Sequence, residues 1–270
     1  MPPIMPSVFF GHGSPMNALQ TNDITQIWSG LAQRLPRPRA ILCISAQWCT
    51  RGTAVTAMRA PRTLHDFGGF PRALFQVQYP APGDTELANT ICELLAPRTV
   101  NLDHSWGLDH GAWAVLIKMY PNADIPVVQL SMNVMLSARE HFEIGRALAP
   151  LREQGVLIMG AGNVVHNLGL MSAYSAVEPY AWAARFNDYV RQAVLDDAPE
   201  RLIEYEALGD DAQLSVPSPD HYWPLLYVMG TRRPHDVVKF ELDFIEHGSL
   251  SMLTVLLDRP RTNGRHPTHE

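Results

Sequence analysis

The sequence predicts a single α/β domain with a mostly parallel central sheet and helices on both faces. Two observations carry this prediction. Short apolar runs of strand character alternate with longer segments of helical spacing, and no internal repeat or Pro/Gly/Ser-rich linker divides the chain. Of the 270 residues 46% are hydrophobic and 18% are charged, which is enough apolar material for a sizeable core. We expect the domain to span residues 1–257, and the polar segment 258–270, rich in Pro, Arg and His, to form a disordered tail.

The first elements follow from short apolar runs and from proline stops. Residues 7–11 form an apolar run ended by glycine, which predicts a buried strand. Residues 22–35 have helical spacing, and the prolines that follow end the helix. Residues 40–46 are rich in β-branched and apolar side chains, and residues 53–58 alternate, so each predicts a strand.

The middle of the chain contains an irregular segment and then a second set of elements. Residues 61–83 hold clustered prolines and glycines and predict a loop. Apolar residues recur at helical spacing in 85–95, in 112–120 and, amphipathically, in 137–154. Residues 126–131 predict a further strand between the last two helices.

The C-terminal part continues the alternation. Residues 156–160 predict a strand and residues 181–196 a helix. Ser218, Pro219 and Asp220 supply a cap, a first-turn proline and a first-turn carboxylate, which predicts a helix start at this point. Residues 240–246 and 249–257 predict the closing strands.

Charge and cysteine content exclude several classes of protein. The net charge is −6 and no long basic run occurs, so the sequence has no electrostatic footprint for nucleic acid. No segment has the length of a membrane span or the pattern of a signal peptide. The cysteines at 43, 49 and 92 are odd in number and lack CxxC spacing, which indicates a reducing compartment. We therefore expect a cytoplasmic protein.

Histidines in short motifs are the main functional signal. His12 follows the first predicted strand, Gln47 follows the second, and His166 comes shortly after strand 156–160. In open α/β sheets, ligands bind outside the carboxyl ends of the strands, so these three positions should meet at one edge. His221 lies in the predicted helix start, where the helix dipole favours the neutral imidazole that binds metals. Imidazoles gathered in this way are typical of a metal site.

Each of these histidines also has a purely structural interpretation. His12 can cap a turn, His166 can be a buried histidine bonded to a carbonyl, and His221 can be a surface residue at a helix start. His110 follows Asp109, which predicts either a partner that orients the imidazole or a simple ion pair.

The remaining histidines carry weaker signals. The dipeptide 65–66 in the glycine-rich loop can form a hydrogen bond within that loop. We assign surface or structural roles to the other histidines, which are His104, His141, His235, His247, His266 and His269.

Motifs of several enzyme classes are missing. The sequence has no HExxH, no GxSxG, no P-loop and no complete GxGxxG. The fragment at 160–162 lacks the third glycine, so nucleotide binding is not supported.

Taken together, the motifs resemble those of the class III extradiol ring-cleaving dioxygenases, and more closely their 4,5-DOPA dioxygenase branch. The resemblance runs in order from about residue 7 to residue 257. It rests on His-Gly-Ser-Pro (12–15), Ser-Ala-x-Trp (45–48), His-Asp-Phe-Gly-Gly-Phe-Pro (65–71), Tyr-Pro-Ala-Pro-Gly (79–83), Gly-Leu-Asp-His-Gly-Ala-Trp (107–113), Gly-Asn-Val-Val-His-Asn (162–167) and His-Tyr-x-Pro-Leu (221–225). No single motif is specific, but the ordered set is.

The resemblance implies an α/β enzyme with a non-haem metal, Fe(II) being expected and Zn(II) sometimes found in the isolated protein. Such an enzyme uses O₂ to open a catechol ring beside its two hydroxyls. It implies that His12 and His221 are metal ligands, that His166 handles protons close to the metal, and that His110 lies near the substrate. The family carries a ligand histidine at the third position of Ser-Ala-x-Trp, whereas this chain has Gln47.

An amide oxygen is a weaker ligand than imidazole for Fe(II) or Zn(II), so Gln47 should weaken metal binding. The sequence is consistent with three outcomes. His166 can serve as the replacement ligand, a water molecule can take the position of the missing imidazole, or the site can hold no iron.

The leading hypothesis for function is therefore an extradiol dioxygenase that acts with O₂ on a catechol such as DOPA, with no nucleic-acid or membrane partner. A second hypothesis is a non-catalytic relative that binds a small molecule or a peptide. A third is a zinc hydrolase, which the lack of an evident carboxylate base disfavours. The sequence does not indicate an oligomeric state.

Overall fold

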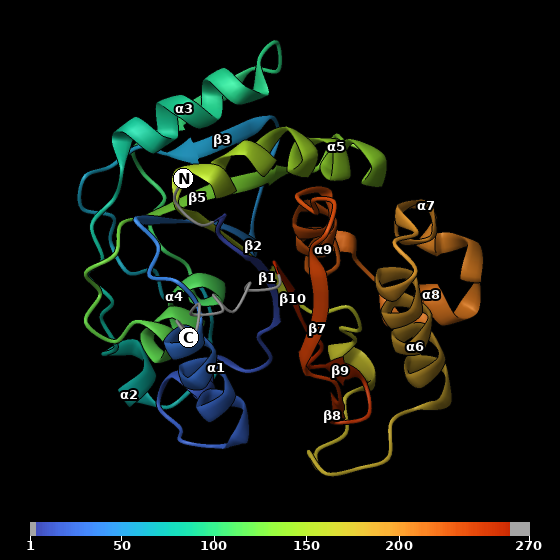
Figure 1. Cartoon of the computed structure of the whole chain (residues 1–270). Coiled ribbons are helices and arrows are strands. Elements are labelled where there is room, and N and C mark those ends of the chain that lie inside the picture. Colours follow the sequence, from blue (N-terminus) through green and yellow to red (C-terminus); the bar gives the residue numbers. More distant parts are fainter. Residues whose placement is uncertain (1–3, 260–270) are drawn as a thin grey trace, which may run out of the picture.

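The computed structural model describes residues 4–259 and is built on one large mixed sheet (Figure 1). Within these residues the sheet has 8 strands in the order β4-β3-β5-β2-β6-β1-β10-β7. The strands are β1 (Ser7–Gly11), β2 (Ala40–Thr50), β3 (Thr53–Thr56), β4 (Val100–Asp103), β5 (Val127–Asn133), β6 (Val156–Gly162), β7 (Val237–Leu242) and β10 (Thr254–Asp258). A separate 2-stranded sheet pairs β8 (Ile245–Glu246) with β9 (Leu250–Ser251).

The centre of the large sheet is parallel. β1, β6, β2 and β5 are neighbours and run in the same direction. Antiparallel pairs join β3 to β5, β10 to β1 and β7 to β10, so the sheet becomes mixed towards its edges. The predicted fold class, a single α/β domain with a mostly parallel sheet, is confirmed. The parallel centre brings the carboxyl ends of β1, β2 and β6 together, which is the edge that the sequence predicts for the site.

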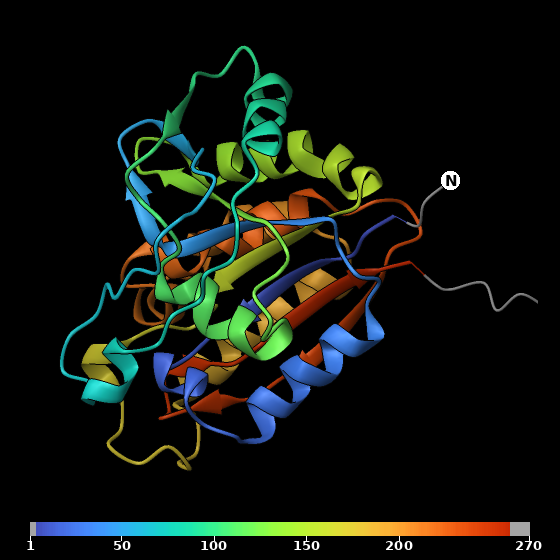
Figure 2. The ribbon, with the colours of Figure 1, turned by 90° about the vertical axis from the view of Figure 1, so that its left-hand side faces the viewer.

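Helices cover both faces of this sheet, as Figures 1 and 2 show. α1 and α4 pack on one face, and α3, α5, α6 and α9 pack on the other. The α-helices are α1 (Asp23–Arg34), α2 (Arg72–Phe75), α3 (Thr85–Leu95), α4 (His110–Met119), α5 (Ala138–Leu148), α6 (Ala181–Leu195), α7 (Pro199–Ile203), α8 (Asp210–Ser215) and α9 (Trp223–Gly230). The 3-10 helices are η1 (Pro15–Ala18), η2 (Ala149–Gln154), η3 (Leu168–Leu170), η4 (Tyr205–Leu208) and η5 (Pro219–His221).

Burial on both faces explains why the central strands are apolar at nearly every position. Phe9 and Leu42 point into the core under α5, α6 and α9, whereas Phe10 and Cys43 point into the core under α1 and α4. Successive side chains of a strand point to opposite faces, so a strand covered on both sides needs a continuous apolar run. This pattern fixes the sheet rigidly beneath the loops that follow its strands.

Several predicted boundaries are wrong, each for an identifiable reason. The helix predicted over 137–154 ends at Leu148 and continues as η2, because Pro150 cannot supply a backbone N–H at the next turn. The strand predicted over 240–246 is instead β7, which begins at Val237, followed by the short β8. The sequence does not predict strand β4, because its alternation of apolar and polar residues covers only the four residues Val100–Asp103, at the exposed edge of the sheet.

No helix within residues 4–259 is long and apolar enough to cross a membrane. The three cysteines are free thiols. Asp258 belongs to β10 rather than to the predicted tail, and most of that tail, residues 260–270, lies outside the described residues.

Candidate active site

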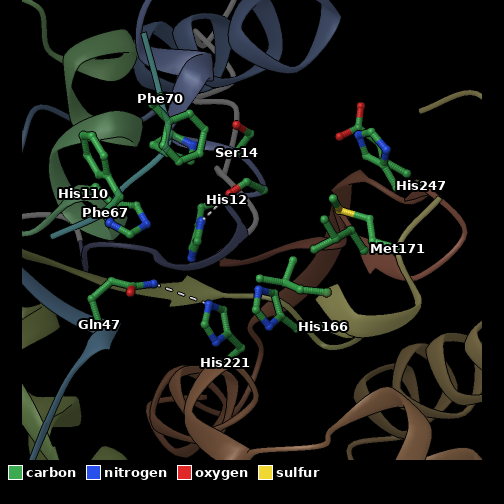
Figure 3. A pocket seen from close by; sticks show the side chains of 15 residues that line it. His12, Ser14, Gln47, Phe67, Phe70, His110, His166, Met171, His221 and His247 are labelled. Carbon is green, nitrogen blue, oxygen red and sulfur yellow. Dashed lines mark hydrogen bonds between the residues drawn. The ribbon is translucent and has the colours of Figure 1, made fainter. Parts of the chain in front are cut away.

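A cavity of about 410 Å³ lies at the carboxyl ends of β1, β2 and β6 (Figure 3). It contains the three side chains that the sequence predicts to meet at one edge, His12, Gln47 and His166, together with His221 and His110. Its lining consists of His12, Gly13, Ser14, Pro15, Gln47, Phe67, Phe70, His110, His166, Leu168, Met171, His221, Glu246, His247 and Leu250. The predicted meeting of these positions at one sheet edge is therefore what the structure shows.

His12 is held in place directly after β1. Its backbone N–H donates to the Gly162 carbonyl at the end of β6, at 3.0 Å. Its Nδ1–H donates to the Gly13 carbonyl at 2.9 Å, because a carbonyl oxygen can only accept. The lone pair is thus on Nε2, which is buried and has no hydrogen-bond partner. A buried nitrogen without a partner is costly unless a ligand satisfies it.

His221 belongs to η5, whereas the α-helix predicted at this point begins later, at Trp223. The backbone N–H of Asn163 donates to the His221 carbonyl at 2.9 Å. A Cβ on Gly162 would lie 2.1 Å from that carbonyl oxygen, so glycine is needed for η5 to approach the end of β6. The Asp220 carboxylate accepts the Nδ1–H of His221 at 2.5 Å and leaves the Nε2 lone pair towards the cavity.

Gln47 lies in β2 beyond the point where this strand stops pairing with β6. The last β2 residue paired with β6 is Ser45, and the pairing with β5 shifts register between Ile44 and Cys49. This irregularity turns the Gln47 side chain towards His221, with Gln47 Nε2 3.4 Å from His221 Nε2. A half-turn of the carboxamide would exchange its oxygen with its nitrogen and present an oxygen at the same place.

His166 stacks on His221. The two ring centroids are 3.5 Å apart and the rings are inclined by 5°. The imidazole planes are therefore parallel and separated, so an ion in the plane of one ring lies out of the plane of the other. Because metals bind imidazole through its in-plane lone pair, these two rings as placed cannot share one ion. The arrangement favours a role for His166 beside the ligands rather than among them.

His110 faces His12 across the cavity, with ring centroids 5.8 Å apart. Asp66 holds it twice: one carboxylate oxygen accepts the backbone N–H of His110 and the other accepts its Nδ1–H, both at 3.0 Å. Burial alone would raise the pKa of Asp66. The hydrogen bonds from His110 together have the larger effect, so the pKa of Asp66 lies below its ordinary value. Asp66 therefore fixes the ring orientation of His110.

Asp109 does not bond to the His110 side chain, which pairs with Asp66 instead, so the predicted role of Asp109 as the orienting partner or ion-pair partner of His110 is wrong. Its carboxylate caps α4 through the backbone N–H of Ala112 and accepts hydrogen bonds from Ser45 Oγ and Gln129 Nε2, both at 2.7 Å. Ser45 lies in β2 two residues before Gln47, so this buried network joins the start of α4 to the strand that carries Gln47.

Burial keeps two of the imidazoles neutral. It lowers the pKa of His12 well below its ordinary value, and the neighbouring His221 and His110 lower it further. Burial and the adjacent His221 lower the pKa of His166 to about 3. Both rings are therefore uncharged near neutral pH, as is required for binding a metal or accepting a proton.

The cavity walls contain four apolar residues that are not among the predicted site residues. Phe67, Phe70, Leu168 and Met171 form apolar walls, and their positions in glycine-rich or irregular loops gave no periodic signal. His247 also lines the cavity, and its Nδ1–H donates to the Ser172 carbonyl at 2.8 Å, which is a structural role of the kind that the sequence assigns to it.

Other histidines lie away from the cavity lining. His65 Nε2 bonds the Val77 carbonyl at 2.9 Å, so its side chain makes the hydrogen bond within the loop that the sequence allowed. His141 is buried against Trp223 and bonds Tyr227 Oη at 2.9 Å. Two predicted surface histidines, His266 and His269, lie outside the described residues.

The donor set fits an ion held by two imidazoles. Among residues 4–259 no group of three or more His, Cys, Asp or Glu side chains is placed to hold a metal. His12 and His221 nevertheless each present an Nε2 lone pair to the cavity, and the first of these is buried without a partner. Gln47 supplies a carboxamide where a third strong ligand would be needed.

Comparisons with known proteins agree with this geometry. Residues 2–238 match the family described as the catalytic LigB subunit of aromatic ring-opening dioxygenase. The chain is 51% identical over 255 residues to a 4,5-DOPA dioxygenase extradiol of Escherichia coli (strain K12), covering 93% of this chain and 94% of that protein. It is 40% identical over 234 residues to the protein of the same description from Beta vulgaris, covering 84% of this chain and 87% of that protein.

A solved structure shares the fold. It is the crystal structure of an uncharacterized protein from Escherichia coli K12, with a TM-score of 0.82 and 46% sequence identity. The match covers 94% of this chain and 99% of that chain.

Proposed function

We propose that this protein opens the ring of a catechol such as DOPA, because the chain belongs to the LigB family of aromatic ring-opening dioxygenases. Enzymes of this family are non-haem, metal-dependent extradiol dioxygenases. The observation that supports this most strongly is the cavity itself. It combines converging imidazoles, a buried Nε2 of His12 without a partner, and aromatic walls of a size suited to one ring.

We propose that His12 and His221 hold an Fe(II) ion, with Gln47 in the third position. When bound, this ion would supply the redox chemistry that lets O₂ react with a catechol beside its hydroxyls. The protein's part is to fix both ligand rings. Gly13 and Asp220 each hold an Nδ1–H, so both Nε2 lone pairs face the cavity before any ligand arrives.

His166 is proposed as the proton-transfer residue. Its ring is neutral near pH 7, lies against His221 and lines the cavity. It is therefore placed to accept a hydroxyl proton from a catechol and to return a proton to the ring-opened product. His110, oriented by Asp66, is proposed to hydrogen-bond the same substrate from the opposite side.

The loop that follows His65 is proposed to hold the aromatic ring and to exclude water. Phe67 packs against His110 at a centroid distance of 5.5 Å and against Phe70 at 5.4 Å. These edge-on contacts make an apolar wall beside the polar end of the cavity. Such a wall binds the ring of a catechol while its hydroxyls face the imidazoles.

Two alternatives are less well supported. The first alternative is a catalytically weakened member of the family that only binds a small molecule or a peptide. Gln47 is the single feature that favours it, since the imidazoles of the site line the cavity. A zinc hydrolase needs a carboxylate base beside the metal-bound water. Glu246, the carboxylate that lines the described cavity, pairs with Leu250 of β9, and its side chain forms no hydrogen bond with His12 or His221. A cytoplasmic location is also proposed, and the free cysteines support it.

The direct test of function is anaerobic reconstitution with Fe(II), followed by addition of DOPA and air. We expect O₂ uptake in step with DOPA loss and the appearance of a yellow ring-opened product. The Zn(II)-reconstituted protein, which cannot undergo redox change, serves as the control. Failure of the iron-loaded protein to consume O₂ with both DOPA and 4-methylcatechol would overturn the proposal.

Replacing Asp66 with asparagine tests the support of His110. The change removes the charge that accepts the Nδ1–H of His110 and should lower kcat/KM for the catechol about 10–100-fold. Metal content should not change, because Asp66 is bonded to His110 rather than to His12 or His221. Nuclear magnetic resonance of the His110 ring nitrogens should show a changed tautomer balance. Wild-type kcat/KM together with a wild-type tautomer would contradict this role.

A further inference from the structure

The cavity has a second polar end, formed by Glu246 and His247. Figure 3 shows His247 on the side of the cavity opposite Gln47, with Met171 between it and His166. Among the 15 residues that line the cavity, Glu246 is the single carboxylate, and no lysine or arginine lines it. The lining therefore carries a negative charge at one end without a cationic side chain to balance it.

The Glu246 carboxylate has no hydrogen bond or ion pair with any residue of the described chain, whereas the other carboxylates around the cavity are occupied. Asp66 is bonded to His110 and Asp220 to His221. Glu246 is partly buried, and this burial raises its pKa above the ordinary value although the adjacent His247 acts in the opposite direction. Partial burial of an uncompensated carboxylate is unfavourable, and a cation in the cavity would relieve it.

This end of the cavity is built on a fixed hairpin. Glu246 belongs to β8, which pairs with β9. His247 Nδ1–H donates to the Ser172 carbonyl at 2.8 Å, and Ser249 Oγ donates to the Asn167 carbonyl at 2.8 Å. β9 also forms a bridge to His166 through Leu250. The hairpin is thus tied to the same segment that carries the proposed proton-transfer residue, so its distance from that residue is set by the fold.

We propose that Glu246 binds an ammonium group on the substrate side chain, so that the site selects catechols that carry a cationic amine. This inference rests on the proposed function, because it places the catechol hydroxyls at the imidazole end. The apolar walls between the two ends, which include Phe70, Leu168 and Met171, then cover the ring and the carbon chain. An ammonium donates three hydrogens and matches a carboxylate acceptor in charge and geometry.

Glu246→Gln in the iron-loaded enzyme tests the proposal, with dopamine as the cationic probe and 4-methylcatechol as the neutral one. The ratio of kcat/KM for dopamine to that for 4-methylcatechol should fall about 10–100-fold, because a charged hydrogen bond becomes a neutral one. The anionic 3,4-dihydroxyphenylpropionate should gain relative to dopamine. Glu178→Gln, which changes an exposed glutamate outside the cavity lining, should keep the wild-type ratio. An unchanged ratio in Glu246→Gln would overturn the inference.

Anaerobic titration calorimetry separates this inference from the proposed function. Dopamine and 4-methylcatechol are titrated into the same iron-loaded proteins, and the ratio of their Kd values is compared between wild type and Glu246→Gln. A lost preference for dopamine supports the role of Glu246 even if no ring is opened, in which case only the proposed reaction fails. Ring opening with equal Kd ratios in both proteins overturns the role of Glu246 and leaves the reaction intact.

Discussion

Replacing His166 with alanine is expected to abolish ring opening while leaving much of the metal in place. His166 lines the cavity and stacks on His221, but its parallel ring does not share an ion with that residue as placed. A positioned proton-transfer residue typically contributes about 10²–10⁴-fold, so turnover should fall by that factor. Steady-state rates with DOPA and the iron content per chain are the two measurements.

The control for this variant is His104→Ala, which removes an exposed histidine outside the cavity lining. It should retain wild-type turnover. His166→Asn keeps a polar side chain and shows whether a loss arises from the imidazole or from the fold around it. Turnover within about tenfold of wild type in His166→Ala would rule out the proton-transfer role, since such a residue supplies more than this. Loss of the iron along with activity would instead identify His166 as a ligand.

Replacing Gln47 with histidine is expected to raise both the affinity for Fe(II) and the rate of ring opening. His12 and His221 supply two imidazole lone pairs, and the Gln47 carboxamide already lies 3.4 Å from His221 Nε2. A third imidazole would complete a face of three nitrogens and leave open positions for catechol and O₂. Removing a residue that only orients a metal ligand typically lowers metal affinity about 10–100-fold. Adding a residue that binds the metal directly should therefore raise the affinity for Fe(II) at least about tenfold.

Anaerobic Fe(II) titration of wild type and Gln47→His measures this affinity, and the yellow product from DOPA measures the rate. Gln33→His, which places a histidine on the exposed face of α1, controls for unspecific iron binding. The carboxamide and the imidazole are similar in size, so unfolding temperatures should differ little. Equal affinity and equal rate in wild type and Gln47→His would show that position 47 does not act at the metal.

The sequence predicts the parallel centre of the fold well because both faces of its strands are buried. Runs such as 8–10 and 156–159 are apolar at every position, and only a strand covered on both faces needs that pattern. The exposed edge strand β4 carries no such signal, and neither do the short helices α2, α7 and α8. Their conformation depends on tertiary contacts rather than on local periodicity.

The same distinction applies to the site. Residues that follow buried strands, His12 and His166 among them, are predictable because strand ends share one edge. The Asp66 contact with His110 was not predictable, since a glycine-rich loop has no period that fixes where its carboxylate points. Glu246 and His247 reach the cavity only through the β8–β9 hairpin, whose pairing spans few residues.

The most direct test of the proposed metal site is a crystal structure of the protein loaded anaerobically with metal. We predict that Nε2 of His12 and Nε2 of His221 both lie about 2.0–2.1 Å from one ion, with the Gln47 side chain turned towards it. An ion farther than about 3 Å from either imidazole nitrogen would contradict the assignment.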